Sequence, residues 1–297
     1  MQSRFWNDPR LWLVLVSVIW GFNFSIVKGG IMAVGPMSFS FTRFALSAVA
    51  MLLVLWKMEG GILIRKRDIP EFMLLGALGF GLYQPLWSWG LRLGLASHSA
   101  IILSISPVVV SIVTFFRKEE EVTWVNLLGV TIGFLGVFFL VRQNQEAIHP
   151  RDVLVANLLT FAAAFCWGLY SYYGRNMLRR YSPLLVSTWS ILFGLCFMLP
   201  VSLPELMTVQ VSEFGPVVWG ALLYGTILSS LLAYIIWLNG VKKLGASRTL
   251  SFQYVIQVFG VLAAWLLFRE PVGYGLLLGM FFVSLGLWLS QRKKRKS

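Results

Sequence analysis

Polar and aromatic side chains recur inside the long apolar stretches of this sequence, at intervals that match a helix. Asn23 follows Trp20 by three residues. Trp87 follows Tyr83 by four, and Gln84 lies between them. Side chains three or four residues apart share one face of a helix. Lipid is a costly environment for such a face, so the pattern predicts a central cavity that binds a small molecule.

The second half of the chain repeats this pattern. Tyr170 follows Trp167 by three residues, and Gln257 follows Gln253 by four. Aromatic walls suit an apolar or aromatic group, and they can also hold a cationic amine. The predicted substrate-binding set is Trp20, Asn23, Arg43, Tyr83, Gln84, Trp87, Ser106, Trp167, Tyr170, Gln253, Tyr254 and Gln257.

Plainer roles compete with cavity lining for these residues. Asn, Gln and Ser often form hydrogen bonds between membrane helices, at roughly 1 kcal/mol or less. Trp and Tyr near the ends of a span are often interface anchors. Pro85 and Pro107 are expected to kink their helices and to serve as gating positions, since proline removes a backbone hydrogen bond.

Two cations fall within apolar stretches. Arg43 has no acidic partner in mid-membrane, so a substrate carboxylate, a helix C-terminus or water must solvate it. We expect Arg43 to select an anionic group along the path. Lys28 lies near the end of its stretch, and either a snorkelling side chain or an unidentified role would explain it.

Residues for covalent or metal chemistry are missing from the sequence pattern. There is no Ser/His/Asp grouping, and the two histidines, His98 and His149, lie at a stretch end and in a loop. We expect no catalytic residue, metal or cofactor. The absence of a mid-membrane acid favours facilitated diffusion or exchange over obligatory proton symport, although Glu120 or Glu270 could still couple transport to protons.

The composition requires lipid as the solvent. Hydrophobic residues make up 58% of the 297 residues, charged residues only 12%, and the mean hydropathy is +0.76. A soluble domain carries roughly 25% charged residues. The net charge of +13 is spread over short loops, so it indicates membrane topology and not nucleic-acid binding.

A helix needs about 20 apolar residues to cross a bilayer. Ten stretches of that kind occur, and the predicted spans are 11–32, 37–57, 70–91, 96–116, 122–142, 153–176, 183–203, 216–238, 248–268 and 272–291. With the N-terminus in the cytoplasm, nineteen of the 25 Lys and Arg residues lie inside and four lie outside. This bias predicts that both termini are cytoplasmic.

The chain also repeats itself. A shift of 150 residues brings Gly90 onto Gly240 and Glu120 onto Glu270, and a shift of 147 brings Trp20-Gly21 onto Trp167-Gly168. Each half holds five predicted spans, so the second half must enter the membrane from the opposite side. We therefore predict an all-α membrane protein with inverted five-helix repeats at 1–147 and 148–297, an arrangement typical of secondary transporters.

Four motifs occur in a specific order. They are Trp20-Gly21-Phe22-Asn23-Phe24 with Lys28, Phe41-Thr42-Arg43-Phe44, Leu103-Ser104-Ile105-Ser106-Pro107-Val108, and Phe252-Gln253-Tyr254-Val255-Ile256-Gln257-Val258 followed by Arg269-Glu270-Pro271. Their order and duplication resemble the drug/metabolite transporter superfamily, in its ten-helix branch of duplicated EamA-type domains. One departure is Gln257, where the family often has a proline matching Pro107.

The resemblance implies a carrier of small metabolites, often an exporter of amino acids, in a bacterial inner or plasma membrane. Together with the aromatic and cationic residues, it predicts alternating-access transport of amino acids with apolar or aromatic side chains, as a monomer or weak homodimer. Proton-coupled efflux of drugs or metabolites is one alternative. A polytopic membrane enzyme or assembly protein is another.

Overall fold

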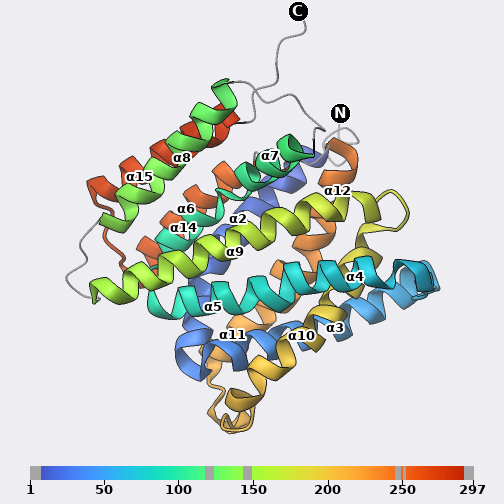
Figure 1. Ribbon diagram of the computed structural model, residues 1–297. Helices are drawn as coiled ribbons and strands as arrows, with labels where there is room; N and C mark the ends of the chain where they lie inside the picture. The colour runs from blue at the N-terminus through green and yellow to red at the C-terminus, as the bar shows by residue number, and fades with distance from the viewer. Residues whose placement is uncertain (1–7, 118–123, 143–148, 245–248, 250–251, 291–297) are drawn as a thin grey trace, which may run out of the picture.

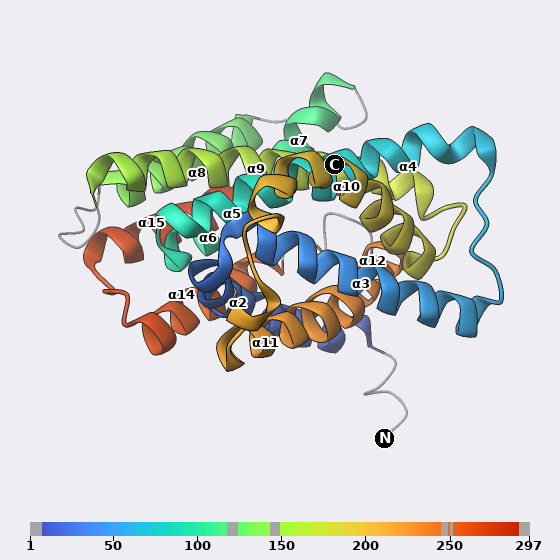
Figure 2. The same cartoon turned by 90° about the horizontal axis from the view of Figure 1, so that it is seen from below.

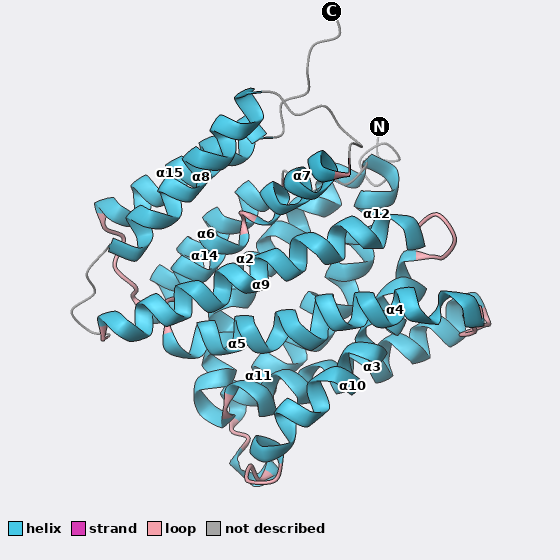
Figure 3. Ribbon diagram, viewed as in Figure 1, coloured by secondary structure: helices cyan, strands magenta, loops and turns pink. Residues whose placement is uncertain are grey.

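The computed structural model describes residues 8–117, 124–142, 149–244, 249 and 252–290. Within these ranges the chain is helical, without strands (Figure 3). The first-half elements are α2 (Pro9–Val34), α3 (Pro36–Glu59), η1 (Lys66–Asp68), α4 (Ile69–Gly76), η2 (Ala77–Leu82), α5 (Tyr83–Leu93), α6 (Ala96–Leu103), α7 (Ser106–Phe116) and α8 (Trp124–Arg142). The second-half elements are α9 (Pro150–Met177), α10 (Pro183–Leu206), η3 (Val211–Glu213), α11 (Pro216–Leu223), η4 (Tyr224–Leu232), α12 (Ala233–Leu244), α14 (Gln253–Phe268) and α15 (Tyr274–Ser290).

Several helices are long and apolar enough to span a bilayer. In the described parts of the chain there are five: Pro9–Val34, Pro36–Glu59, Pro150–Met177, Pro183–Leu206 and the continuous Pro216–Leu244. Shorter apolar helices accompany them. In a helix every backbone polar group finds its partner within the segment, which is the condition for crossing lipid. The chain is therefore an α-helical integral membrane protein.

Capping residues and prolines set where the long helices begin. The side chain of Asp8 accepts a hydrogen bond from the Arg10 N–H at 2.9 Å, and Pro9 opens α2. Ser182 caps α10 in the same way, accepting from the Leu185 N–H at 3.1 Å. Proline suits the first helical position because its missing N–H would have no partner there.

The two singled-out prolines lie beside irregular backbone. Pro85 is in the first turn of α5, immediately after the π-helical segment η2. A proline at this position cannot bond the preceding turn, and a π segment is one way in which a helix accommodates the freed carbonyl. Pro107 is the second residue of α7, after a break in which α6 ends at Leu103. A second π segment, η4, joins α11 to α12.

Helices α8 and α15 pack against each other at one edge of the bundle (Figure 1). Glycines allow this close approach. A Cβ added at Gly286 would lie 2.4 Å from the Gly133 nitrogen, and one at Gly136 would lie 2.7 Å from Val283. The small-residue faces of these helices are therefore used within the chain.

Helices from the two halves are interleaved in the rest of the bundle. Helix α2 packs on α14, α11 and α12, and α9 packs on α5, α6 and α7, while α3 lies against α10. The perpendicular view keeps α8 and α9 on the opposite side from α11 and α14 (Figure 2). Gly21 lets α2 approach Phe259, with an added Cβ at 2.4 Å, and Gly168 lets α9 approach Val109, at 2.8 Å. The core helices surround a central cavity.

Candidate functional site

The central cavity is lined by side chains from both halves of the chain. Its volume is about 50 Å³, counted as the space open to the centre of a water-sized sphere. This is room for a few waters, because one water needs about 10–15 Å³ on that scale. The lining residues are Trp20, Asn23, Phe24, Arg43, Tyr83, Gln84, Trp87, Leu103, Trp167, Ser229, Tyr234, Gln253 and Ile256.

Most of the predicted set lines this cavity. These residues are Trp20, Asn23, Arg43, Tyr83, Gln84, Trp87, Trp167 and Gln253. Four predicted residues lie elsewhere. The Ser106 hydroxyl donates to the Leu103 carbonyl at 2.6 Å, across the break between α6 and α7. Tyr170 stacks on Trp167 at 5.2 Å behind the cavity wall, and Tyr254 is also outside the lining.

Gln257 has the interhelical role that competed with cavity lining. Its Oε1 accepts a hydrogen bond from the Ser104 hydroxyl at 3.0 Å, and its Nε2 donates to Ser284 at 2.6 Å. The amide therefore ties α14 to the break between α6 and α7 and to α15. This use is consistent with the replacement of a family proline at the position.

Five lining residues did not belong to the predicted set: Phe24, Leu103, Ser229, Tyr234 and Ile256. Apolar Phe24, Leu103 and Ile256 carry no signal that separates them from other core residues. Ser229 and Tyr234 could have been found, since both are polar groups inside the predicted span 216–238.

Arg43 is a buried cation without a charged partner. It is 2% exposed, and its guanidinium carbon lies 4.2 Å above the Phe44 ring. Its Nε is buried and finds no hydrogen-bond partner among the described residues. In the described parts of the chain, no carboxylate lies within 4.0 Å of this guanidinium. The compensation found there comes from two aromatic rings, Phe44 and, at 6.0 Å, Trp87, so the cation retains unused donor capacity.

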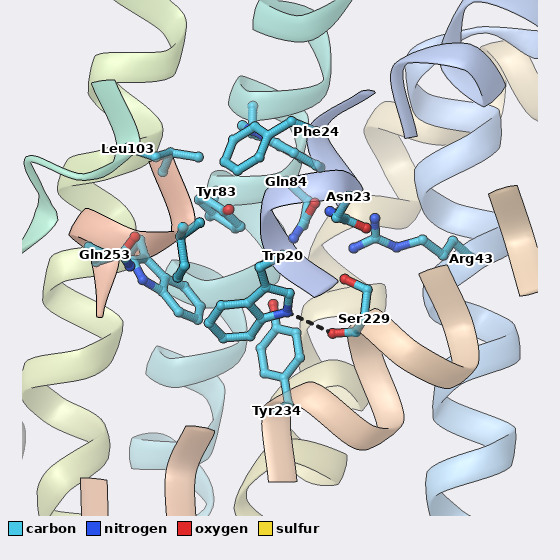
Figure 4. Close-up of a pocket in the computed structure, with 13 residues that line it drawn as sticks. Trp20, Asn23, Phe24, Arg43, Tyr83, Gln84, Leu103, Ser229, Tyr234 and Gln253 are labelled. Carbon is cyan, nitrogen blue, oxygen red and sulfur yellow. Dashed lines mark hydrogen bonds between the residues drawn. The ribbon is translucent and has the colours of Figure 1, made fainter. Parts of the chain in front are cut away.

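Polar atoms gather beside Arg43. Oδ1 of Asn23, Oε1 of Gln84 and Nε1 of Trp87 are buried, and the described residues supply none of them with a hydrogen-bond partner. Figure 4 shows the Asn23 and Gln84 amides close together, with the Arg43 guanidinium alongside. Buried polar atoms are nearly always paired with protein or water. This wall of the cavity is therefore suited to a polar ligand or to water.

Another part of the lining is aromatic. The Trp20 ring lies 5.8 Å from that of Trp167 and 5.5 Å from that of Tyr234. The Trp20 Nε1–H donates to the Ser229 carbonyl at 3.0 Å (Figure 4). The Tyr224 hydroxyl donates to the Ile19 carbonyl at 2.7 Å. Both bonds fasten η4 to α2, so the π segment helps to hold the aromatic wall.

Lys28 is not explained by snorkelling. Its side chain is buried, and Nζ donates to Oε1 of Glu270 at 3.0 Å and to the Gly94 carbonyl at 2.8 Å. Glu270 lies in the connection between α14 and α15. Burial alone would raise the pKa of this carboxyl, but Lys28 and donors from Ser97 and Ala96 outweigh burial and hold the pKa below its ordinary value. Lys28 and Glu270 thus form a buried ion pair.

Carboxylate side chains join helix α3 to helix α10 at both ends of the pair. Glu205 Oε2, at the end of α10, accepts from the N–H groups of Met37 and Ser38 at 2.8 and 3.0 Å. At the other ends, the Ser182 hydroxyl donates to Glu59 at 2.9 Å. Carboxylates are favourable at helix N-termini, so Glu205 caps α3 directly, while Glu59 holds the N-cap residue of α10.

This architecture matches a known protein family and a solved structure. The profile of the EamA-like transporter family matches residues 10–142 and again residues 154–291. A solved crystal structure superimposes with a TM-score of 0.66 at 14% identity, covering 93% of this chain and 94% of the other. At that identity the likeness concerns the fold alone.

The relatives described below are named as transporters. The chain is 27% identical over 276 residues to the uncharacterised transporter YyaM of Bacillus subtilis, covering 91% of this chain and 89% of the relative. It is 25% identical to a probable terminal-alkyne amino-acid exporter of Streptantibioticus cattleyicolor, covering 87% and 84%. It is 23% identical to a probable amino-acid metabolite efflux pump of Salmonella typhimurium, covering 93% and 92%. The chain therefore belongs to the EamA-like transporter family, a family of transporters and not of enzymes.

Proposed function

We propose that this protein is a secondary transporter that exports amino acids with apolar or aromatic side chains by facilitated diffusion or exchange. The observation that carries the proposal is the buried, unpaired Arg43 beside the unpaired oxygens of Asn23 and Gln84. A substrate carboxylate would pair with the guanidinium, and such charge-assisted bonds are among the strong ones. The two amide oxygens would accept from the substrate ammonium.

The aromatic wall supports the choice of side chain. Trp20, Trp167 and Tyr234 pack against one another in the cavity lining. An apolar or aromatic substrate side chain would be buried against them. The cavity in this structure is smaller than such a substrate, so we expect the helices around it to move apart when a substrate enters.

We propose alternating access between inverted halves, 1–147 and 148–297, with ten spans and cytoplasmic termini. Matched packing supports this, since α2 uses Gly21 against α14 as α9 uses Gly168 against α7. The separate family matches to the two halves support it as well. Two similar packings can exchange roles, and this exchange would open the central site to alternate sides. The bacterial inner membrane is the proposed location.

The passive mechanism is supported by the state of Glu270. All four hydrogen bonds to its carboxylate favour the ionised form, so it is poorly suited to pick up a proton near neutral pH. The proposal needs no cofactor. In the described ranges no group of three His, Cys, Asp or Glu could hold a metal.

The test is counterflow of radiolabelled phenylalanine or leucine in proteoliposomes, comparing the wild type with Arg43→Gln. Loss of one charge-assisted partner, about 1.5–3 kcal/mol, should weaken apparent affinity for the amino acid by roughly 10- to 100-fold. Competition by the matching amino-acid amide, which lacks the carboxylate, should change much less. Equal losses for acid and amide, or none for either, would overturn the role of Arg43. Absence of saturable counterflow by the wild type with any amino acid would overturn the amino-acid assignment.

A further inference from the structure

A single carboxylate holds three segments together at one end of the bundle. Oε1 of Glu270 accepts from Lys28 Nζ at 3.0 Å and from the Ala96 N–H at 2.9 Å. Oε2 accepts from the N–H and the hydroxyl of Ser97 at 3.0 and 2.6 Å. Glu270 and Lys28 are 5% and 8% exposed. This network joins the end of α2, the start of α6 and the α14–α15 connection.

The network is built on helices that also line the cavity. Lys28 is one helical turn beyond the lining residue Phe24 in α2, and α6 runs from Ala96 to the lining residue Leu103. Helix α14 packs closely on α6, because a Cβ added at Gly260 would lie 2.4 Å from that of Ala100. Separation of these three segments would therefore also open the end of the cavity that faces Lys28.

The two ends of the bundle differ at equivalent positions. At the Lys28 end, Gly90 of α5 is pressed against α9, and an added Cβ would lie 2.5 Å from Oγ1 of Thr160. Its sequence counterpart Gly240, at the other end, also packs closely, with an added Cβ 2.9 Å from Leu13, but it borders a groove of about 310 Å³ with Trp12 and Lys243. The structure is thus tightly closed where Lys28 and Glu270 meet, and it is hollowed at the opposite end.

We propose that Lys28, Glu270 and the first turn of α6, bounded by Ala96 and Ser97, form the outer gate of the transport path. This inference rests on the proposed alternating access and orientation. A buried cation that loses its counter-ion is strongly unfavourable. Neutralising Glu270 would leave Lys28 uncompensated only while the gate is closed, because an opened gate lets water reach Lys28. The neutral variant should therefore populate the outward-open state.

The experiment measures exposure of the cavity and not transport. The reporter is Ser229→Cys, a cavity position, in a background with Cys166→Ala and Cys196→Ala. A membrane-impermeant maleimide is applied to the outer face of right-side-out vesicles. We expect slow labelling of this reporter, and labelling faster by about tenfold or more once Glu270→Gln is added. Lys28→Met should act in the same direction, and Lys28→Arg should preserve slow labelling.

The matched control is Glu205→Gln. Glu205 also caps a helix N-terminus with two backbone bonds, but no lysine pairs with it among the described residues. Its neutralisation should leave outer labelling unchanged. If Glu270→Gln labels no faster than Glu205→Gln, the gate is overturned, whatever the counterflow of the wild type shows. If counterflow fails while Glu270→Gln still accelerates labelling, the gate stands and the amino-acid assignment falls.

Discussion

Gly225 lies directly against the side chain of Arg43. A Cβ added at Gly225 would be 2.4 Å from Cδ of Arg43 and 3.0 Å from its Cγ. Gly225 belongs to the π segment η4 of the second half, and Arg43 belongs to α3 of the first half. The only cation lining the described cavity is therefore positioned by the absence of a side chain on a helix from the other half of the chain.

Gly225→Ala should displace Arg43 without changing any charge. We expect apparent affinity for the amino acid to fall by about tenfold, with a smaller effect on the amino-acid amide, because the misplaced guanidinium loses one charge-assisted bond. Counterflow in proteoliposomes measures this. Gly220→Ala is the control, since a Cβ there meets nothing within 4 Å. An unchanged affinity in Gly225→Ala would show that Arg43 does not depend on this contact.

Trp20→Phe should loosen η4 from α2. It removes the Nε1–H bond to the Ser229 carbonyl, while an aromatic ring still faces Trp167 and Tyr234. An unpaired buried carbonyl costs about 1–3 kcal/mol, so the apparent Tm in detergent should fall by several degrees. Trp167→Phe is the comparison, because its indole nitrogen makes no hydrogen bond to a described residue. An equal decrease in apparent Tm for the two variants would show that the lost hydrogen bond is not the cause.

Gly286→Ala should force α8 and α15 apart. The added methyl group would meet backbone atoms of Gly133 and Gly129 at 2.4 and 2.6 Å, and backbone cannot move aside as a flexible side chain can. Overpacking of this kind costs about 1–3 kcal/mol. We expect a lower apparent Tm by scanning fluorimetry, whereas Gly220→Ala should keep the wild-type value. Retention of full stability by Gly286→Ala would contradict the close packing of these helices.

Transport should depend little on pH between about 5.5 and 8. Against the effect of burial, Lys28 and the donors of Ser97 and Ala96 hold the pKa of Glu270 in the folded protein below its ordinary value. Its stabilising contribution is therefore complete above the unfolded pKa and is lost only as pH falls through the folded pKa. Counterflow measured across this range, with and without an imposed pH gradient, checks the expectation. Uptake that required the gradient would instead support proton coupling.

Local composition was enough to predict a helical membrane protein and much of the cavity lining. Apolar runs long enough to span a bilayer, with so few charges, indicate that the chain folds in lipid. Polar and aromatic residues at helical spacing, such as Trp20 with Asn23 and Tyr83 with Trp87, indicated inward faces for the same reason. Both are consequences of residue type and period, which the sequence contains.

The tertiary structure decided which neighbour each inward face meets. Helical period places Gln253 and Gln257 on one face, yet only Gln253 reaches the cavity, while Gln257 bonds Ser104 and Ser284. The rotation and depth of each helix depend on packing, such as the close approaches permitted by Gly21 and Gly168. The pairing of Lys28 with Glu270, 242 residues away, has the same origin, since no local pattern specifies contacts between distant helices.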